Sequence, residues 1–357
     1  MRKFSFVLIM LALVLVFGLA FVSCGGDDGN NNTPGGNTPG GNNPGGGDMT
    51  WTAVAESPFN LGISDIAYGN GRFVAVGISF SNGALNNKIA YSTDGATWTA
   101  LDSPLDTSYF SSFSYCHDRF VAAWNIYKDG VNSYKMAYST DGVTWTVADS
   151  PFGTFPTHAV AYGNGRFVAV GGNVVGNSGI AYSSDCITWT PVADSTFGRY
   201  IIRDIAYGNN RFIAVGGGEF SQGIAYSTDG VTWTAVADVP FGYYQSVKAI
   251  VYGNNRFVVV VSNPMEYSEF IRFSADGESW TSGVAFGTIY AIAYGNNRWV
   301  IGAVTAEWMA SSTDNGTTWK GVANNPFSAT RTSVQVIAFG NGRFVAGGDD
   351  GMIAYSN

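Results

Sequence analysis

From residue 49 to the C-terminus, short apolar runs alternate with turn-forming residues in an order that repeats along the chain. β-Branched and aromatic residues dominate each run, which is typical of half-buried strands. In most copies an Asn-Gly or Asn-Asn pair separates the first two runs and suits a two-residue hairpin turn, because both turn residues adopt positive φ. This hairpin occurs seven times, at Ile66–Gly77, Phe113–Trp124, Val160–Gly171, Ile205–Gly216, Ile250–Val261, Ile292–Ala303 and Ile337–Gly348.

Each copy predicts four strands, here called A to D. In the fourth copy these are Asp204–Tyr207, Arg211–Gly216, Gly223–Ser227 and Val231–Val236. The arginine that opens strand B recurs every 42 to 47 residues, a period that fits one four-stranded propeller blade. The sequence therefore predicts an all-β fold, a seven-bladed β-propeller of four-stranded antiparallel blades, over residues 49–357.

The two ends of the repeat region predict how the ring closes. A repeated Trp marks strand D, and the first one, Trp51, precedes every repeat arginine. The chain begins this region with a lone strand D at Thr50–Val54 and stops after a strand C that ends at Ser356. We therefore expect the last blade to be closed by the N-terminal strand, which removes the open edges that would otherwise favour aggregation.

The turn between strands C and D carries a short motif, complete in Ser312–Trp319 and one residue shorter in copies such as Ser92–Trp98. With this motif the chain resembles the Asp-box (BNR) propellers, a group that includes sialidases and several non-enzymatic proteins. The resemblance implies the propeller fold and a structural role for the motif turn. The repeat Arg and the motif Asp occupy the same slot in successive copies, so we interpret them as structural hydrogen-bonding groups.

The N-terminus has the pattern of an export signal. Arg2 and Lys3 precede an apolar run, Phe6–Phe21, that ends at small residues before Cys24. The run is shorter than the ~20 residues that a membrane span needs. We interpret residues 1–23 as a lipoprotein signal peptide, and an uncleaved N-terminal anchor is the alternative.

Phe21-Val22-Ser23-Cys24 resembles a lipobox, in which the cysteine is acylated and becomes the first residue of the mature protein. This resemblance predicts lipid attachment at Cys24, a location in the cell envelope and a membrane contact through the lipid. Gly25 after the cysteine favours the outer membrane, with the surface or periplasmic side left open. Residues 24–48, rich in Gly, Asn and Pro, predict a flexible tether that cannot pack a core.

Charge excludes one class of partner. The chain has a net charge of −8, and removing Arg2 and Lys3 leaves 16 basic against 26 acidic residues, a net charge of −10. Such a surface repels a phosphate backbone, so we expect no nucleic-acid partner. Cysteine and histidine are too few and too scattered for a zinc site, and one Asp per motif turn does not supply a calcium shell. We expect neither a metal nor a cofactor.

One set of positions varies where the rest of the repeat does not. Two residues before the first apolar residue of strand A stand seven polar residues, and nearly all of them differ: Ser64, Ser111, His158, Arg203, Lys248, Tyr290 and Gln335. Because strand A is the innermost strand of a blade, these side chains should surround the mouth of the central channel. They are our candidate ligand-binding residues, with Tyr200 and Tyr244 as stacking neighbours. The alternative is that strand starts are simply wet and therefore polar.

These observations favour a non-catalytic binding module for a glycan or protein ligand. A sialidase-type glycoside hydrolase is the first alternative, because four arginines lie outside the repeat slots: Arg199, Arg203, Arg272 and Arg331. Such an enzyme needs an arginine triad, a Tyr nucleophile with an acidic partner, and an acid/base Asp, and no spacing here selects them. The second alternative is an assembly scaffold for a membrane complex, similar to the propeller assembly factors of photosynthetic membranes. We assign no catalytic residue.

Overall fold

The structure is a computed structural model that describes residues 49–357 apart from 82–83, 102–104, 106–108, 130, 173–178, 194, 199–200, 219–220, 238–244, 264, 266–267, 282, 305–308 and 324. The predicted signal peptide, Cys24 and the tether lie outside the described residues, as do Tyr200, Tyr244 and Arg199.

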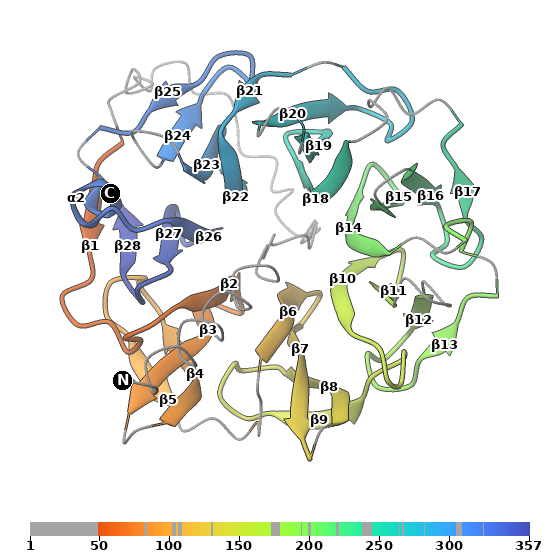
Figure 1. Ribbon diagram of the computed structural model, residues 1–357, viewed down its shortest axis with the longest axis horizontal. Helices are drawn as coiled ribbons and strands as arrows, with labels where there is room; N and C mark the ends of the chain where they lie inside the picture. Colours follow the sequence, from red (N-terminus) through yellow and green to blue (C-terminus); the bar gives the residue numbers. More distant parts are fainter. Residues whose placement is uncertain are drawn as a thin grey trace, which may run out of the picture.

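Seven four-stranded antiparallel sheets surround a central axis, as predicted from the repeat (Figure 1). The innermost strand of each sheet, strand A, contacts strand A of the neighbouring blades and so forms a closed inner ring. These strands, from blade 1 to blade 7, are β2 (Ile63–Gly69), β6 (Tyr109–Cys116), β10 (Thr157–Gly163), β14 (Ile202–Gly208), β18 (Ser246–Gly253), β22 (Thr288–Gly295) and β26 (Val334–Gly340).

Strands B and C follow outward in each blade. The B strands are β3 (Arg72–Ser81), β7 (Arg119–Lys128), β11 (Arg166–Gly171), β15 (Arg211–Gly218), β19 (Arg256–Asn263), β23 (Arg298–Val304) and β27 (Arg343–Gly348). The C strands are β4 (Ala84–Ser92), β8 (Val131–Ser139), β12 (Gly179–Ser183), β16 (Ser221–Ser227), β20 (Ser268–Ser274), β24 (Met309–Ser312) and β28 (Ile353–Ser356).

The outer D strands are shorter than the sequence predicts. They are β5 (Thr99–Leu101), β9 (Thr146–Asp149), β13 (Thr190–Pro191), β17 (Thr234–Ala235), β21 (Ala285–Phe286), β25 (Lys320–Gly321) and β1 (Trp51–Ala53). In six blades the repeated Trp belongs to the turn before strand D, where the Trp98, Trp233, Trp280 and Trp319 indoles donate to the carbonyl of the turn glycine. A short helix, α2 (Pro326–Thr330), lies in the loop that enters blade 7.

The predicted closure of the ring is confirmed. Strand β1 pairs antiparallel with β28, with Trp51 opposite Ser356 and Ala53 opposite Ala354. Two more backbone bonds extend this pairing, from Val54 to the Ile353 carbonyl and from Asn357 to the Thr50 carbonyl. Trp51 is only 7% exposed, so both ends of the repeat region contribute to the core of the last blade.

The core lies between the blades. Each apolar cluster combines side chains of neighbouring sheets, such as Val74 and Ile89 of blade 1 with Phe113 and Phe120 of blade 2. The repeated glycine that ends strand A makes this packing close at the inner ring. A Cβ on Gly69 would lie 2.0 Å from the Tyr115 ring of the next blade, which explains the glycine found here in six of the seven copies. Among the residues described, no helix has the length and apolar character of a membrane span.

Candidate functional site

All seven candidate ring residues are β-bulges. In each blade the register between strands A and B skips one residue of strand A, so this residue has no partner opposite it. A bulge re-aims a side chain without interrupting the sheet and is frequent at functional sites. The skipped residues are Ser64, Ser111, His158, Arg203, Lys248, Tyr290 and Gln335. We call this set the bulge ring.

Side chains of the bulge ring connect neighbouring blades. The Ser111 hydroxyl donates to the Thr157 carbonyl at 2.9 Å, directly before His158 on the next blade. His158 in turn contacts the Ile202 carbonyl through Nδ1 at 2.7 Å, directly before Arg203. Because a carbonyl only accepts, Nδ1 must carry the proton in this contact. Burial, and secondarily the charge of Arg203, lower the pKa of His158, so the neutral ring with an accepting Nε2 is favoured near pH 7.

Lys248 does not offer a free charge to a ligand. Its Nζ forms an ion pair with Oε1 of Glu269, a strand-C residue that is only 3% exposed. Oε2 of Glu269 accepts from the Ile289 backbone N–H at 2.7 Å, next to Tyr290 in the following blade. Burial, followed by the charges of Glu269 and Asp349, raises the pKa of Tyr290, so its phenol stays protonated and can donate.

Arg203 is the uncompensated charge of the bulge ring. The residue is exposed, and no described residue forms a hydrogen bond or ion pair with its guanidinium. Enough protein surrounds the group that desolvation lowers its pKa, although the guanidinium remains charged. With His158 neutral and Lys248 paired with Glu269, Arg203 is the charged member of the bulge ring that no described residue balances.

Sequence reasoning missed two buried carboxylates next to the ring. Asp65 and Asp204 directly follow the bulge in blades 1 and 4, and they are only 3% and 4% exposed. Asp204 accepts from Ile205 N at 2.8 Å and from Ile250 N of the next blade at 2.8 Å. Burial raises the pKa of Asp204 to about 8 and raises that of Asp65 well above its usual range. The sequence does carry a signal for these two residues, because only two of the seven copies have Asp directly after the bulge position.

On the opposite face the structural role predicted for the repeat arginines is confirmed. In six blades the guanidinium donates to a carbonyl in the C–D turn of the next blade, at 2.6 to 3.4 Å. The same group stacks over an aromatic ring of its own strand C, 5.1 to 5.7 Å from the ring centroid. We call this contact the arginine latch. The six residues are Arg72, Arg119, Arg166, Arg211, Arg256 and Arg343.

Arg298 is the exception, and the split blade explains it. Its counterpart turn would join strands C and D of blade 7, but strand D of that blade is β1, from the other end of the chain. Arg298 instead contacts the Ser311 hydroxyl of its own blade at 3.4 Å.

The motif Asp shapes the C–D turn. In blade 1, Asp94 Oδ1 accepts from Ala96 N and Thr97 N, both at 2.8 Å, and from the Ser92 hydroxyl at 2.9 Å. Equivalent contacts lower the pKa of Asp185 to about 2, with the Thr188 and Ile187 N–H groups as the main causes. These carboxylates are turn-forming groups, as predicted. The described residues include no cluster of His, Cys, Asp or Glu suited to a metal ion.

The structure describes three of the four arginines that lie outside the repeat slots, and these three belong to different blades. Of the three that the structure describes, Arg203 lies on β14 of blade 4 and Arg272 on β20 of blade 5. Arg331 follows α2, at the entry to blade 7. Glu269, an acidic residue on the same strand as Arg272, is paired with Lys248. The described arginines therefore lie on three separate elements.

Comparisons with known proteins support the fold. No protein-family model and no curated protein matches this sequence. The solved structure of YCF48 bound to D1 peptide is similar, with a TM-score of 0.61, 19% identity and coverage of 85% of this chain and 96% of that one. The WD40 β-propeller domain of Doa1 is similar with a TM-score of 0.56 and 11% identity, over 87% of this chain and 97% of that one. YjhT is similar with a TM-score of 0.52 and 11% identity, over 75% of this chain and 99% of that one. At these identities the likeness shows the propeller fold alone.

Proposed function

We propose that this chain is a non-catalytic binding module whose ligand contacts the bulge ring at the channel mouth. One observation carries the proposal: the seven polar, varying positions at the start of strand A coincide with the seven β-bulges, and no described residue balances the charge of one of them, Arg203. The backbone register of strands A and B is the same in all seven blades, so strand geometry alone does not require different side chains at these positions. His158, Lys248 and Tyr290 would be the neighbouring contacts of the ligand, with Tyr200 and Tyr244 stacking beside it.

The chemistry around Arg203 favours a ligand with one carboxylate beside neutral hydrogen-bonding groups. A guanidinium pairs well with a carboxylate, while a neutral His158 accepts and the Tyr290 phenol donates. An acidic glycan and an acidic polypeptide segment both fit this description. A propeller of similar fold is known with a bound peptide, and this supports a protein ligand as one of the two candidates. A scaffold for a membrane complex would be one form of this function.

Binding is tested by comparing wild type with Arg203→Gln on a glycan array and an array of acidic peptides. Loss of one charge-assisted contact should weaken binding about 10-fold or more. Arg331→Gln is the matched control, because it removes the same charge from an exposed residue outside the bulge ring. Equal binding by both variants and wild type would place the site elsewhere. Release of sialic acid by the wild-type protein would favour the hydrolase instead.

We further propose that the chain is an exported lipoprotein of the Asp-box type. Cleavage before Cys24, lipid attachment to it and the tether would hold the propeller away from the outer membrane. The lipobox-like sequence and the Ser-Asp turns of the C–D connections support this proposal. Replacing Cys24 by Ser should release the protein from membrane fractions or leave it unprocessed. A Cys24→Ser variant that is still processed and membrane-bound would refute lipid attachment.

A further inference from the structure

Three of the A–B turns have the same local sequence, Gly-Asn-Gly-Arg-Phe, in which the asparagines are Asn70, Asn164 and Asn341. Each of these asparagines has a φ of 47° or 48°, and the glycine that follows has a φ of 74° to 76°. Positive φ at both positions is the geometry of a tight two-residue hairpin turn. The three asparagines therefore share their sequence context and their backbone φ, and they differ in what the next blade offers their side chains.

An Asn-Gly pair can lose its side-chain amide without an enzyme. The backbone nitrogen of the glycine attacks Cγ of the asparagine, the displaced proton passes through solvent to the amide nitrogen, and ammonia leaves. Water then opens the resulting succinimide ring at either carbonyl, which gives aspartate or isoaspartate. Glycine favours the attack because it has no Cβ to shield its nitrogen. The reaction consumes one water and needs no other reactant.

The attacking nitrogens are accessible in all three turns. The asparagines and the glycines after them are exposed. No described residue accepts a backbone hydrogen bond from Gly71, Gly165 or Gly342, and a Cβ built on any of them would meet nothing within 4 Å. The nucleophile is therefore equally available at each turn. Differences in rate should come from how firmly the asparagine side chain is held.

Asn164 is held by two hydrogen bonds from the next blade. Its Nδ2 donates to the Thr228 carbonyl at 2.6 Å, and its Oδ1 accepts from the Tyr207 phenol at 2.8 Å. Both bonds must break before the amide can rotate and bring Cγ to the glycine nitrogen. Each exposed bond of this kind should slow the reaction about 2- to 10-fold, because only the opened side chain reacts.

The other two asparagines are held by one bond each. Asn70 Nδ2 donates to the Thr140 carbonyl at 2.8 Å, and Asn341 Nδ2 donates to the Thr93 carbonyl at 3.3 Å. Among the described residues, no side chain donates to Oδ1 of either one. The bond of Asn341 is the longest of the three and therefore the weakest. Its side chain should open most often.

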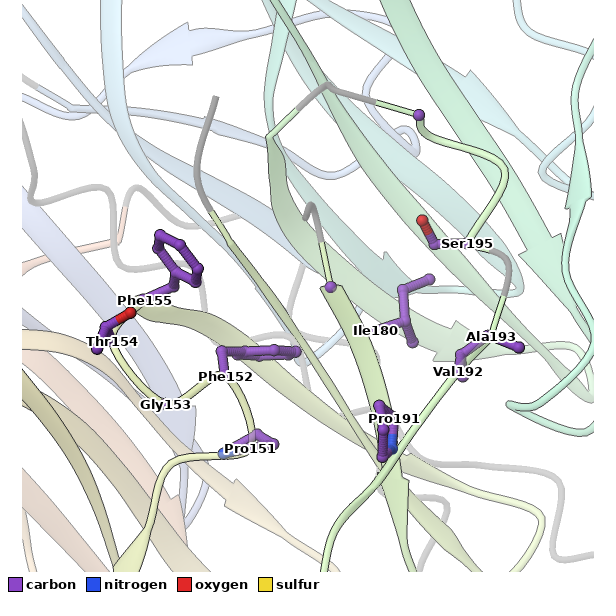
Figure 2. A pocket seen from close by; sticks show the side chains of 12 residues that line it. Pro151, Phe152, Gly153, Thr154, Phe155, Ile180, Pro191, Val192, Ala193 and Ser195 are labelled. Atoms are coloured by element: carbon purple, nitrogen blue, oxygen red, sulfur yellow. The ribbon is translucent and has the colours of Figure 1, made fainter. Parts of the chain in front are cut away.

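A ligand in the blade 3 cavity would not shield Asn164. Phe152 extends from the entry loop toward Pro191 in this cavity (Figure 2). The lining residue Gly179 pairs with Gly171, the last residue of strand β11, whereas the turn of Asn164 precedes the first residue of that strand. The cavity and the turn thus lie at opposite ends of the blade, and the protection of Asn164 comes from its two bonds to blade 4.

We propose that Asn341 is a site of spontaneous deamidation, and that it converts faster than Asn70 and faster still than Asn164. The Asn341 bond joins the last blade to the first, next to the latch between Arg343 and the Asp94 carbonyl. Aspartate at position 341 would present an acceptor to the Thr93 carbonyl in place of a donor, and isoaspartate would lengthen the main chain of a two-residue turn. Either product weakens this junction. The proposal does not depend on the channel-mouth site, because no residue is shared between the two.

The test is peptide mapping by mass spectrometry during incubation of the purified full chain in mildly alkaline buffer. In the folded protein, conversion at Asn341 should be about 2- to 10-fold faster than at Asn164, with Asn70 between them. In denaturant the three sites should convert at the same rate, because their local sequences are identical. Asn82 and Asn315 also precede glycine, but in other sequence contexts, and they are followed separately. Equal rates at the three turns of the folded protein, or faster conversion at Asn164 than at Asn341, would overturn the proposal.

Two variants separate the cause from the consequence. Tyr207→Phe removes one bond from Asn164 and keeps the ring, so it should speed conversion at Asn164 about 2- to 10-fold and leave Asn341 unchanged. Asn341→Asp reproduces one product and should lower Tm by roughly 2–4 °C. Asn43→Asp, in the predicted tether, is the matched control for the added charge. An unchanged rate at Asn164 in Tyr207→Phe would refute protection by the side-chain bonds, and an unchanged Tm in Asn341→Asp would refute the weakened junction.

Discussion

Both faces of the propeller consist of turns and loops, but the two faces use them differently. On the face of the A–B and C–D turns, six arginine latches repeat with the same partners. On the other face the bulge ring repeats only its backbone geometry, and its side chains differ from blade to blade. Six of the seven blade junctions share the latch contact, so its residues are the same in each of these blades. The bulge-ring side chains share no such contact and differ from blade to blade, and the ligand site that we propose lies among them.

The largest expected loss of stability comes from opening the ring. Deleting residues 49–55 removes β1, exposes the edge of β28 and takes Trp51 out of the core. Loss of a buried Trp side chain alone costs about 3–5 kcal/mol. At about 2 °C per kcal/mol for a domain of this size, Tm should fall by roughly 6–10 °C or more. Circular dichroism melts measure this, with deletion of residues 25–47 as the control. An unchanged Tm would contradict closure by the N-terminal strand.

The latch itself is tested at two junctions that differ in one contact. Arg166 donates to the Asp229 carbonyl of the next blade at 2.6 Å and stacks over Tyr182. Among the described residues, Arg298 contacts only the Ser311 hydroxyl of its own blade, at 3.4 Å. Arg166→Ala should cost about 1.5–3 kcal/mol of unfolding free energy, and Arg298→Ala less than about 1 kcal/mol. Chemical denaturation measures both free energies of unfolding. Equal losses would show that the hydrogen bond to the next blade does not stabilise the fold.

The buried carboxylates of the inner ring should make the free energy of unfolding fall as pH rises. Burial raises the pKa of Asp204 to about 8, from an ordinary value of 3.8. Between these pH values the folded state holds a proton that the unfolded chain releases, so unfolding free energy should fall as pH rises through this window. The loss is on the order of a few kcal/mol for a fully buried group. Asp204→Asn should flatten this slope in denaturation measured from pH 4 to 8.

The motif carboxylates on the other face should make the free energy of unfolding depend on pH with the opposite sign. Backbone N–H groups lower the pKa of Asp185 to about 2, so its contribution is present above pH 4 and is lost as pH falls toward 2. Asp185→Asn should therefore reduce the loss of stability below pH 4 and leave the slope above pH 4 unchanged. The same denaturation series detects it, and a slope of the same sign for Asp185 and Asp204 would contradict the contrast.

The smallest effect is expected at a bulge residue without side-chain contacts. Gln335 makes no side-chain hydrogen bond to any residue that the structure describes, so Gln335→Ala should change stability by less than about 0.5 kcal/mol. His158→Ala should cost about 1 kcal/mol more, because it removes the bond to the Ile202 carbonyl. If Gln335→Ala costs as much as a latch, the bulge ring has a structural role and its variation needs another explanation.

The blades, the order of their strands and the closure by β1 were all predictable from the sequence. Their causes are local or periodic: the Asn-Gly and Asn-Asn turns, the strand-forming runs, and the position of Trp51 before the first repeat arginine. The seven candidate ring residues could also be chosen from the sequence, because they are polar positions that differ between copies of the repeat. The extent of strand D was not, because the Asp and Trp contacts that shape each C–D turn keep the Trp out of the strand.

Other properties depend on residues that only the tertiary structure brings together. The pairing of Lys248 with Glu269 joins residues 21 positions apart, and the burial of Asp204 against the Ile250 N–H joins residues 46 positions apart on neighbouring blades. A repeat determines what every blade has in common. Charge compensation and open space at one place depend on which unlike side chains meet there, and the tertiary structure decides that.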